Sequence, residues 1–353
     1  MKTITVNASK SYDVIIGSDF LTKAGAMIRE KAGGQTAAIV TDDNVSALYG
    51  KTAEDSLKNA GYRVVNYIFP HGEESKNSET FFSLINFLAA EKLSRTDVIV
   101  ALGGGVTGDI AGFAASTFKR GTRLVQIPTT LLAAVDSSVG GKTGINLNEG
   151  KNQLGTFYQP DLVLCDVSLL STLPPQVYSD GIAEVIKYGI IEDSELFNLL
   201  EKEIKEKIEE VIYRCIKIKR DIVSEDEFEQ GGRKLLNFGH TVGHAIELLS
   251  DYKVSHGHAV AVGMAVETRA ASSMGICNEQ CLQDILSILD LYGLPGATEY
   301  SAKELANACL SDKKRDGDNI SMVFPEKIGK CIIKEIPIGE VEPVIKAGLG
   351  RSK

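Results

Sequence analysis

The feature that most constrains the fold is an alternation, in the first half of the chain, between short apolar runs and patterns typical of helices. The apolar runs, rich in β-branched residues, cover residues 37–41, 63–69, 98–102, 124–128 and 162–166. Continuous apolar strands that alternate with helices indicate a parallel sheet with both faces covered. Ligands of such sheets bind beyond the carboxyl ends of the strands. We therefore predict an α/β domain with a parallel sheet and expect functional residues at that edge.

In the second half of the chain long amphipathic helical patterns replace the strands. Residues 194–222 carry apolar side chains at helical spacing, and Ser194 is a suitable N-cap. The segment Leu173-Pro174-Pro175 separates the two patterns, because proline interrupts regular structure. A chain of 353 residues is also long for a single hydrophobic core. We predict an α/β domain over residues 1–176 and a mainly α-helical domain over residues 177–353.

Charge, cysteine usage and hydropathy limit the partners of the chain. The net charge of -9, without any basic run, argues against nucleic acid as a partner. The six cysteines lack C-x-x-C spacing, and the N-terminus lacks the apolar core of a signal peptide. No apolar run approaches the length that spans a bilayer. These features predict a cytoplasmic protein with no membrane role, whose thiols are buried or idle.

Four of the five histidines, His240, His244, His256 and His258, gather in one short stretch. His240 and His244 lie one helical turn apart, so a helix presents both imidazoles on one face. Such a pair alone is often a surface or core feature. With the third histidine a metal centre is favoured, since neutral imidazole is the commonest ligand of catalytic metals. Thr241 replaces the catalytic Glu of the H-E-x-x-H motif, so peptide hydrolysis is not expected.

A glycine-rich loop over residues 103–109, GGGVTGD, follows the apolar run 98–102 and precedes a helical pattern. It matches G-x-G-x-x-G in the context that this motif requires. Its glycines let backbone amides approach a pyrophosphate at a helix N-terminus. The loop does not follow the first strand, and a glycine triplet can also form an ordinary tight turn. The favoured interpretation is nucleotide binding.

Residues 135–144, VDSSVGGKTG, end like a P-loop but fail its full pattern. Asp136 stands where the first glycine of G-x-x-x-x-G-K-[ST] is required, so ATP or GTP hydrolysis is not expected. What remains is a loop of small residues with Asp136 and Lys142, followed by Lys151 and Asn152. The loop can be read as a solvated turn, but charged residues that flank backbone glycines favour an anion site.

Two charged residues, Glu184 and Lys187, interrupt an otherwise apolar helical pattern at i, i+3. A surface salt bridge would explain them. A buried functional pair is preferred, because the neighbouring isoleucines and valine leave little solvated face. Glu184 would then supply the carboxylate that commonly completes a two-histidine zinc site. Spacing alone does not choose Glu184 over Glu247 or Glu267.

Together these segments resemble the 3-dehydroquinate synthase family of sugar phosphate cyclases. The resemblance rests on residues 103–109, on 126–144 (QIPTTLLAAVDSSVGGKTG), on 150–152 (GKN), on 181–189 (GIAEVIKYG) and on 235–247 (LLNFGHTVGHAIE). It implies an N-terminal NAD-binding α/β domain and a C-terminal helical domain that binds metal and substrate, a plan shared with glycerol dehydrogenase. It also implies an active site between the domains and a homodimer.

The resemblance implies a role for particular residues of this chain. The metal, zinc or cobalt, would be bound by Glu184, His240 and His256. NAD would contact Asp42, Asn44, Glu73, Lys76, Gly104, Gly105, Val106, Thr107, Gly108, Asp109, Thr129, Thr130, Lys142, Lys151 and Thr172. Substrate and catalytic contacts would come from Asp136, Lys142, Asn152, Lys187, Lys219, Glu229, Arg233, Asn237, His244 and a lysine of the pair Lys313 and Lys314. Arg120 would reach the active site of the other subunit.

The implied reaction converts 3-deoxy-D-arabino-heptulosonate 7-phosphate to 3-dehydroquinate and phosphate, the second step of the shikimate pathway. It proceeds by NAD-mediated transient oxidation, phosphate elimination, reduction and intramolecular aldol closure, so the enzyme is a carbon–oxygen lyase that regenerates NAD. Residues such as Lys142, Asn152 and His244 suit a cradle for the leaving phosphate. Arg233 suits bidentate binding of the substrate carboxylate.

One departure from the family pattern is His258, since the family usually has Glu at that position. Either His256 or His258 could then reach the metal, and His256 is preferred. Three rival functions are another sugar phosphate cyclase (2-deoxy-scyllo-inosose or epi-valiolone synthase), a metal-dependent polyol dehydrogenase, and a nucleotide-sensing protein without catalysis. Arg233, Asn237 and Lys219 favour a carboxylated substrate over those of the other cyclases.

Overall fold

The structure, a computed structural model, describes the whole chain except residues 149, 203, 312–314, 317 and 350–353. It divides into two compact units. Unit 1 comprises Met1–Pro174 and Lys219–Glu227, and unit 2 comprises Pro175–Ile218 and Phe228–Lys353. The sequence-based division after residue 176 assigned Lys219–Glu227 to the second domain, whereas the structure groups this segment with the first.

The inserted segment belongs to unit 1 because its side chains bond there. Lys219 Nζ lies 2.9 Å from Asp136 Oδ1 and donates to the Asp136 carbonyl at 2.7 Å. Glu227 accepts hydrogen bonds from the backbone N–H and hydroxyl of Ser9, and from Gln159 Nε2 at 2.8 Å. The helix that carries Lys219, α8 (Ile208–Glu225), therefore starts in unit 2 and ends in unit 1.

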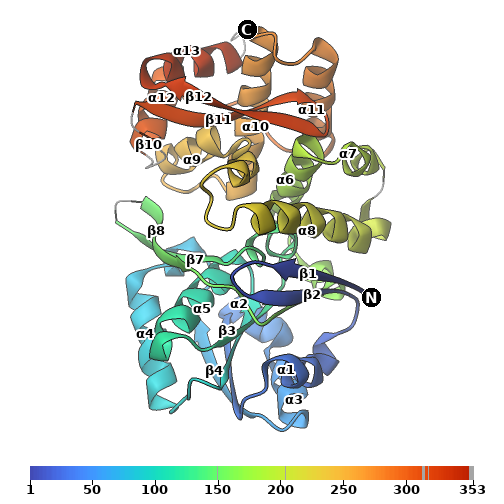
Figure 1. The fold of residues 1–353 in the computed structure, drawn as a ribbon, viewed down its shortest axis with the longest axis vertical. Coiled ribbons are helices and arrows are strands. Elements are labelled where there is room, and N and C mark those ends of the chain that lie inside the picture. Colours follow the sequence, from blue (N-terminus) through green and yellow to red (C-terminus); the bar gives the residue numbers. More distant parts are fainter. Residues whose placement is uncertain (149, 203, 312–314, 317, 350–353) are drawn as a thin grey trace. The chain divides into compact units, whose positions relative to one another are not determined.

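The sheet of unit 1 confirms the predicted parallel α/β fold (Figure 1). Its seven strands run in the order β1 (Lys2–Asn7), β2 (Ser11–Gly17), β9 (Leu162–Asp166), β6 (Arg123–Pro128), β5 (Val98–Gly103), β3 (Thr36–Asp42) and β4 (Arg63–Phe69). Only the pair β1 and β2 is antiparallel, and all other neighbours are parallel. The predicted strands correspond to β3, β4, β5, β6 and β9. The β1–β2 hairpin was not predicted, because polar residues alternate with its apolar ones.

Alternation along the strands builds a core on each face of this sheet. In β5, Val98 and Val100 belong to one buried cluster and Ile99 and Ala101 to the other. Helices α1 (Ala24–Ala32) and α3 (Lys51–Asn59) contribute to the first cluster. Helices α4 (Ser78–Ala90) and α5 (Gly105–Thr117) contribute to the second. Both faces are thus covered, which is why the central strands read as continuous apolar runs.

Unit 1 also contains short helical segments and a second sheet. The antiparallel pair β7 (Lys142–Leu147) and β8 (Gly150–Phe157) forms this sheet. The short segments are η1 (Leu21–Lys23), α2 (Asp43–Val45), η2 (Ser46–Gly50), η3 (Glu73–Ser75), η4 (Phe118–Arg120), η5 (Ala133–Ser137) and η6 (Val167–Thr172).

Unit 2 is mainly helical. Its helices are α6 (Pro175–Ile191), α7 (Ser194–Leu200), η7 (Ile204–Lys207), the first part of α8, η8 (Gly232–Asn237), α9 (His240–Leu249), α10 (His256–Ser273), α11 (Glu279–Leu291), α12 (Ala302–Ser311) and α13 (Ile338–Gly348). The predicted pattern over residues 194–222 is broken between α7 and α8. Unit 2 also has a small antiparallel sheet of β10 (Arg315–Asp316), β11 (Asn319–Lys327) and β12 (Lys330–Pro337), which was not predicted (Figure 1).

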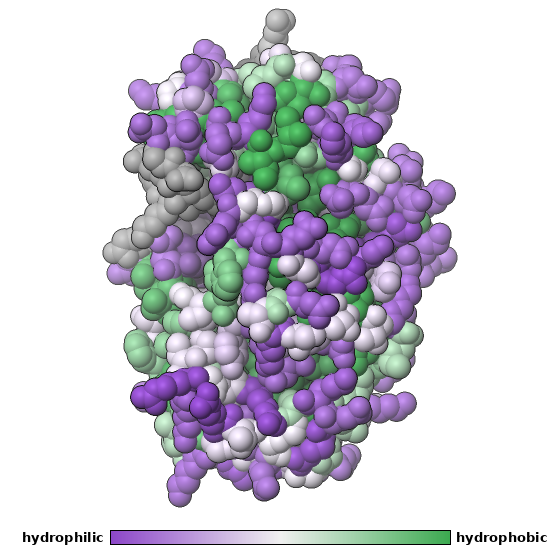
Figure 2. All heavy atoms as spheres, viewed as in Figure 1, coloured by the Kyte–Doolittle hydropathy of each residue, from purple (hydrophilic) through white to green (hydrophobic). Residues whose placement is uncertain are grey.

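The surface and the cysteines show no membrane or disulfide signature among the described residues. No helix in that part of the chain is long and apolar enough to cross a bilayer. Hydrophilic side chains cover much of the face drawn in Figure 2, with smaller apolar areas between them. All six cysteines are buried, and none of them forms a disulfide bond.

Helix α10 is largely buried within unit 2, and glycines of both α9 and α10 allow these two helices to pack closely. A Cβ atom at Gly263 would lie 1.9 Å from the backbone oxygen of Gly239, and one at Gly243 would lie 3.1 Å from Val260 Cα. Glu267, also in α10, is fully buried and accepts a hydrogen bond from the Gly239 N–H at 2.7 Å. The turn that precedes α9 is therefore fixed by α10.

We expect Gly263→Ala to destabilise unit 2, because its new methyl group would collide with backbone that cannot move aside. Overpacking of about 2–3 kcal/mol should lower the midpoint of thermal unfolding by roughly 5 °C or more. Gly339→Ala is the matched control, since it also lies in a helix but its Cβ would meet no atom within 4 Å. Circular dichroism melts of both variants test this, and equal midpoints would contradict the packing described for Gly263.

Candidate active site

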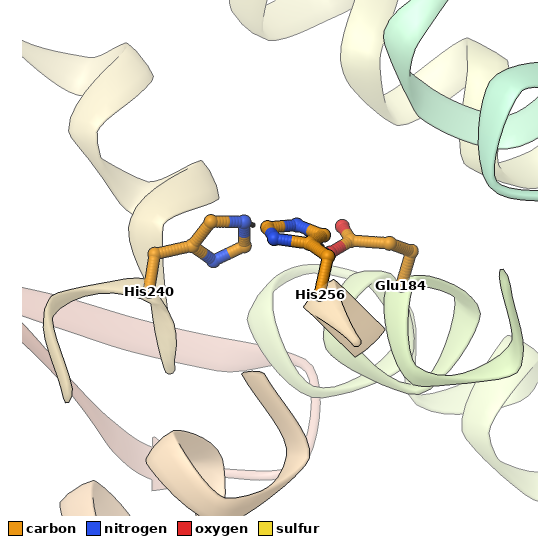
Figure 3. Close-up of side chains that lie close together, drawn as sticks. All are labelled: Glu184, His240 and His256. Carbon is orange, nitrogen blue, oxygen red and sulfur yellow. Dashed lines mark ion pairs between the residues drawn. The ribbon is translucent and has the colours of Figure 1, made fainter. Parts of the chain in front are cut away.

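Three side chains of unit 2 bring their donor atoms together (Figure 3). Glu184 lies in α6, His240 at the start of α9 and His256 at the start of α10. Glu184 Oε1 is 3.5 Å from His240 Nε2 and 3.4 Å from His256 Nε2. The three donor atoms lie within 4.8 Å of one another. One carboxylate and two imidazoles are a donor set typical of catalytic zinc, with a further position left for water or substrate.

The carboxylate of this group is deeply buried. Glu184 and Lys187 are each 1% exposed and form an ion pair one turn apart in α6. The surface salt bridge that the sequence left open is therefore excluded. Lys187 contacts Glu184 through Oε2, which leaves Oε1 facing the two histidines. A buried carboxylate is costly unless cationic or hydrogen-bonding groups surround it, so this arrangement fits a divalent cation.

His256 lies in a strongly anionic environment. Its Nε2 faces Glu184 and its Nδ1 is 3.1 Å from Glu247 Oε2. Burial by itself would lower the pKa of His256, but hydrogen bonds to these two carboxylates and their charges outweigh it and raise the pKa to about 10. The same charges favour any cation at this position, a metal ion included.

His244 stands beside this group. The centroid of its ring is 5.5 Å from that of His240 and 6.0 Å from that of His256. His244, Glu247 and His256 also form a second group of potential donor atoms within 4.8 Å of one another. His256 is thus common to both groups.

His258, which departs from the family pattern, makes different contacts. Its Nδ1 is 2.8 Å from Asp180 Oδ1 and 2.9 Å from Ser255 Oγ. Among the described residues His258 belongs to neither group of potential metal donors, whereas His256 belongs to both. This geometry favours His256 as the ligand.

The other predicted substrate residues of unit 2 lie on η8 and just before it. Arg233 is 1% exposed, and a guanidinium so deeply buried requires anionic or hydrogen-bonding partners. Asn237 Nδ2 donates to Glu229 Oε1 at 2.7 Å. Lys313 and Lys314 lie outside the described residues.

Most of the residues predicted to bind NAD lie at the carboxyl edge of the unit 1 sheet, whereas Lys142 and Lys151 lie on β7 and β8. Because β3, β4, β5, β6 and β9 run parallel, the segments that follow them emerge at the same edge. Asp42 ends β3, and the following segments carry Asn44 after β3, Glu73 and Lys76 after β4, residues 104–109 after β5, Thr129 and Thr130 after β6, and Thr172 after β9. In open α/β sheets this edge is where ligands bind.

The glycine-rich loop connects β5 directly to α5, as the nucleotide-binding motif requires. Gly104 is the N-cap of α5, and residues 105–109 form its first turn. A Cβ atom at Gly108 would lie 2.7 Å from Gln126 Oε1, so this glycine allows α5 to pack closely on β6. Two hydroxyls here, Thr107 Oγ1 and Thr129 Oγ1, are buried without a hydrogen-bond partner among the described residues. The helix N-terminus and these hydroxyls fit a bound dinucleotide.

A polar network joins the predicted cofactor and substrate residues of unit 1. Lys76 Nζ contacts both Asp109 Oδ2 and Asn152 Oδ1. Burial raises the pKa of Asp109, against the opposing charge of Lys76. Lys151 Nζ lies 3.9 Å from Glu73 Oε1.

Asp136 and Lys219 are paired as described above, and two further predicted residues are exposed. Lys142 begins β7 and Arg120 ends η4, and both side chains reach solvent in the single chain. The backbone of Arg120 has φ +64°, a left-handed conformation that is uncommon for a residue other than glycine.

Sequence reasoning missed one residue of this region. Asn146, in β7, donates from Nδ2 to Glu73 Oε1 at 2.8 Å and accepts from the Asn152 N–H at 2.9 Å. Its own N–H donates to the Lys76 carbonyl at 2.9 Å. The available signal was its position two residues after Gly144, in the segment between Lys142 and Lys151.

Comparisons with known proteins cover nearly the whole chain. The family model described as 3-dehydroquinate synthase N-terminal matches residues 66–180, and the one described as 3-dehydroquinate synthase C-terminal matches residues 181–315. A protein of Streptococcus suis named 3-dehydroquinate synthase is 42% identical over 96% of this chain and 98% of its own length. A protein of Enterococcus faecalis with the same name is 43% identical over 97% of each chain.

Solved structures show the same fold. A 2-deoxy-scyllo-inosose synthase complexed with carbaglucose-6-phosphate, NAD+ and Co2+ superposes with a TM-score of 0.87 at 28% identity, over 99% of this chain and 100% of that one. A 2-epi-5-epi-valiolone synthase of Streptomyces hygroscopicus with NAD+ and Zn2+ bound has a TM-score of 0.87 at 28% identity, over 97% and 98%. A glycerol dehydrogenase of Schizosaccharomyces pombe, 18% identical, shares the fold alone with a TM-score of 0.63, over 95% and 88%. With two family models across most of its length and relatives above 40% identity, the chain belongs to the 3-dehydroquinate synthase family.

Proposed function

We propose that the chain converts 3-deoxy-D-arabino-heptulosonate 7-phosphate to 3-dehydroquinate and inorganic phosphate, using NAD and one divalent metal ion. The observation that carries this choice is the 42–43% identity over nearly the full length to proteins named 3-dehydroquinate synthase. The cyclases with other products that share the fold are only 28% identical. The enzyme is a carbon–oxygen lyase, and its reaction is redox-neutral overall.

Glu184, His240 and His256 would hold the metal, and the carboxyl-edge residues of unit 1 would hold NAD. When bound, the metal would acidify a substrate hydroxyl and NAD would accept and later return a hydride. Zinc and cobalt both suit a donor set of two imidazoles and one carboxylate.

The side chains of the protein would supply charge and orientation for an anionic substrate. The leaving phosphate would be stabilised by hydrogen bonds and positive charge. These would come from Lys142, Asn152, Asn237 and His244. Arg233 would hold the carboxylate through its two parallel N–H donors. Since the whole chain is negatively charged, this local set of cations must recognise the substrate.

The assembly and location follow as further parts of this proposal. We infer a homodimer in which Arg120 serves the active site of its partner subunit. The six buried cysteines, none in a disulfide bond, suit a reducing compartment, and we infer the cytoplasm. The only partner that the function requires is the phosphorylated small-molecule substrate.

A subunit-mixing experiment tests the role of Arg120. Arg120→Ala and Lys142→Ala chains are each expected to be inactive alone. If Arg120 acts across a twofold interface, random exchange of subunits should restore about one quarter of the wild-type activity, because half of the dimers regain one intact site. Activity that stays at the level of the unmixed variants would show that Arg120 acts within its own chain or outside the site.

The function itself is tested by phosphate release from the heptulosonate with catalytic NAD and zinc, while NADH absorbance is followed in the same cuvette. Phosphate in large excess over NAD, with no lasting NADH, is expected. Turnover of glucose 6-phosphate or sedoheptulose 7-phosphate in its place would indicate another cyclase. Steady NADH formation from a polyol would indicate a dehydrogenase, and absence of all turnover despite NAD and zinc binding would indicate a binding protein.

A further inference from the structure

His256 is held from both sides of its ring. Its Nε2 faces Glu184 Oε1 at 3.4 Å, and its Nδ1 faces Glu247 Oε2 at 3.1 Å. Glu247 is 1% exposed, so its carboxylate has little access to bulk water. An ionised carboxylate can only accept hydrogen bonds, so at Glu247 it would pair with the tautomer of His256 that carries its proton on Nδ1.

The other two members of the donor group are held in a similar way. His240 Nδ1 lies 3.0 Å from the Phe238 carbonyl oxygen, and Glu184 Oε2 contacts Lys187. Each potential ligand therefore directs one polar atom toward the other two ligands. Its second polar atom contacts a neighbouring residue outside this group. Such outer contacts fix the tautomer and the ring orientation of metal-binding histidines.

We propose that Glu247 is a positioning residue that accepts the Nδ1 proton of His256 and so presents an unprotonated Nε2 to the metal. This inference rests on the metal centre of the proposed function. No motif or comparison assigns the role, and sequence spacing offered Glu247 only as an alternative ligand.

Helix geometry explains how Glu247 reaches His256. His240 and Glu247 are seven residues apart in α9, so they lie on the same face two turns from each other. Gly243 lies between them and brings α9 close to α10, where His256 begins the helix. One helix thus supplies a ligand from its first turn and the support for a second ligand from its third.

The main alternative is that Glu247 itself binds a second metal ion with His244 and His256. That arrangement would require both nitrogens of His256 to be deprotonated at once. A neutral imidazole keeps a proton on one nitrogen, which the contact with Glu247 uses. A single ion per chain, with Glu247 in the outer shell, is therefore the arrangement that the geometry favours.

The experiment compares Glu247→Ala and Glu247→Gln with a matched control, Asp180→Asn. Asp180 is also a carboxylate that contacts the Nδ1 of a histidine in the first turn of α10, but that histidine is His258. Zinc affinity is measured by competition with a chelator, metal content by elemental analysis, and ligand geometry by the visible spectrum of the Co2+-substituted protein. Thermal melts of the metal-free proteins separate this effect from a loss of folding.

In Glu247→Ala the zinc affinity is expected to fall about 10- to 100-fold with an altered Co2+ spectrum. Glu247→Gln, whose amide oxygen can still accept the proton, should recover most of the affinity, and Asp180→Asn should match the parent. Parental zinc affinity and Co2+ spectrum in Glu247→Ala would overturn the inference. Two ions per parent chain and one in Glu247→Ala would overturn it in favour of a second metal site. A parent chain that binds no metal would overturn the metal centre itself.

Discussion

Replacing His256 by Ala is expected to remove the bound metal and with it the catalytic activity, whereas His258→Ala should retain both. His256 Nε2 lies 3.4 Å from Glu184 Oε1 and belongs to the buried donor group. His258 instead contacts Asp180 and Ser255. Loss of one of three protein ligands should weaken zinc binding by more than about 100-fold, beyond the effect of losing an outer-shell contact.

The measurement is zinc content after dialysis against a weak chelator, together with phosphate release at saturating zinc. His258→Ala serves as the control, because both histidines lie in the first turn of α10. Retention of zinc in His256→Ala, with loss in His258→Ala, would reverse the ligand assignment.

Arg233→Lys is expected to lower kcat/KM for the heptulosonate by about 100-fold or more, although the positive charge is kept. A lysine cannot reproduce the two parallel N–H donors that a carboxylate accepts from arginine. In a buried site, a substrate group that is left without its hydrogen-bonding partner binds much more weakly in the transition state. Arg233 is 1% exposed, so water cannot easily replace the missing donor.

Steady-state kinetics across heptulosonate concentrations check this prediction, and NAD and zinc affinities show whether the rest of the site is intact. The control is Lys234→Gln, which removes the adjacent charge from η8. Lys234 contacts Ser321 and Glu335 at the small sheet of unit 2, so its loss should leave kcat/KM near the parental value. Similar kinetics for Arg233→Lys and the parent would assign the carboxylate to another cation.

The sequence predicted the central strands of unit 1 well, because strands covered on both faces read as unbroken apolar runs. Val98–Gly103 is such a strand. The β1–β2 hairpin was missed because it has no unbroken apolar run. Thr3 and Thr5 alternate with apolar residues in β1, which lies at an edge of the sheet. The small sheet of unit 2 was missed for a different reason, because its two longer strands, which pair Ile320 with Ile336, lie among the helical patterns of the second half of the chain.

The site could be predicted only as far as residue types allow. Three clustered histidines favoured a metal centre, but the spacing did not choose among three carboxylates, Glu184, Glu247 and Glu267. The structure separates them by their contacts: Glu184 faces both imidazoles, Glu247 supports one of them, and Glu267 accepts the Gly239 N–H. These contacts arise where α6, α9 and α10 converge, and spacing within one helix cannot reveal which face meets which neighbour. The roles implied by resemblance for individual NAD and substrate contacts stay predictions.

The inserted segment Lys219–Glu227 has a consequence for how such a chain can be divided or recombined. The polypeptide passes between the units three times, after residues 174, 218 and 227. A fragment that stops at Pro174 would lack the hydrogen bonds of Ser9 and Gln159 to Glu227. It would also lack the ion pair of Asp136 with Lys219. Residues 1–174 alone therefore do not make up the complete unit 1. A chimera between cyclases that exchanges residues 1–174 should therefore also carry Lys219–Glu227, so that these contacts are kept.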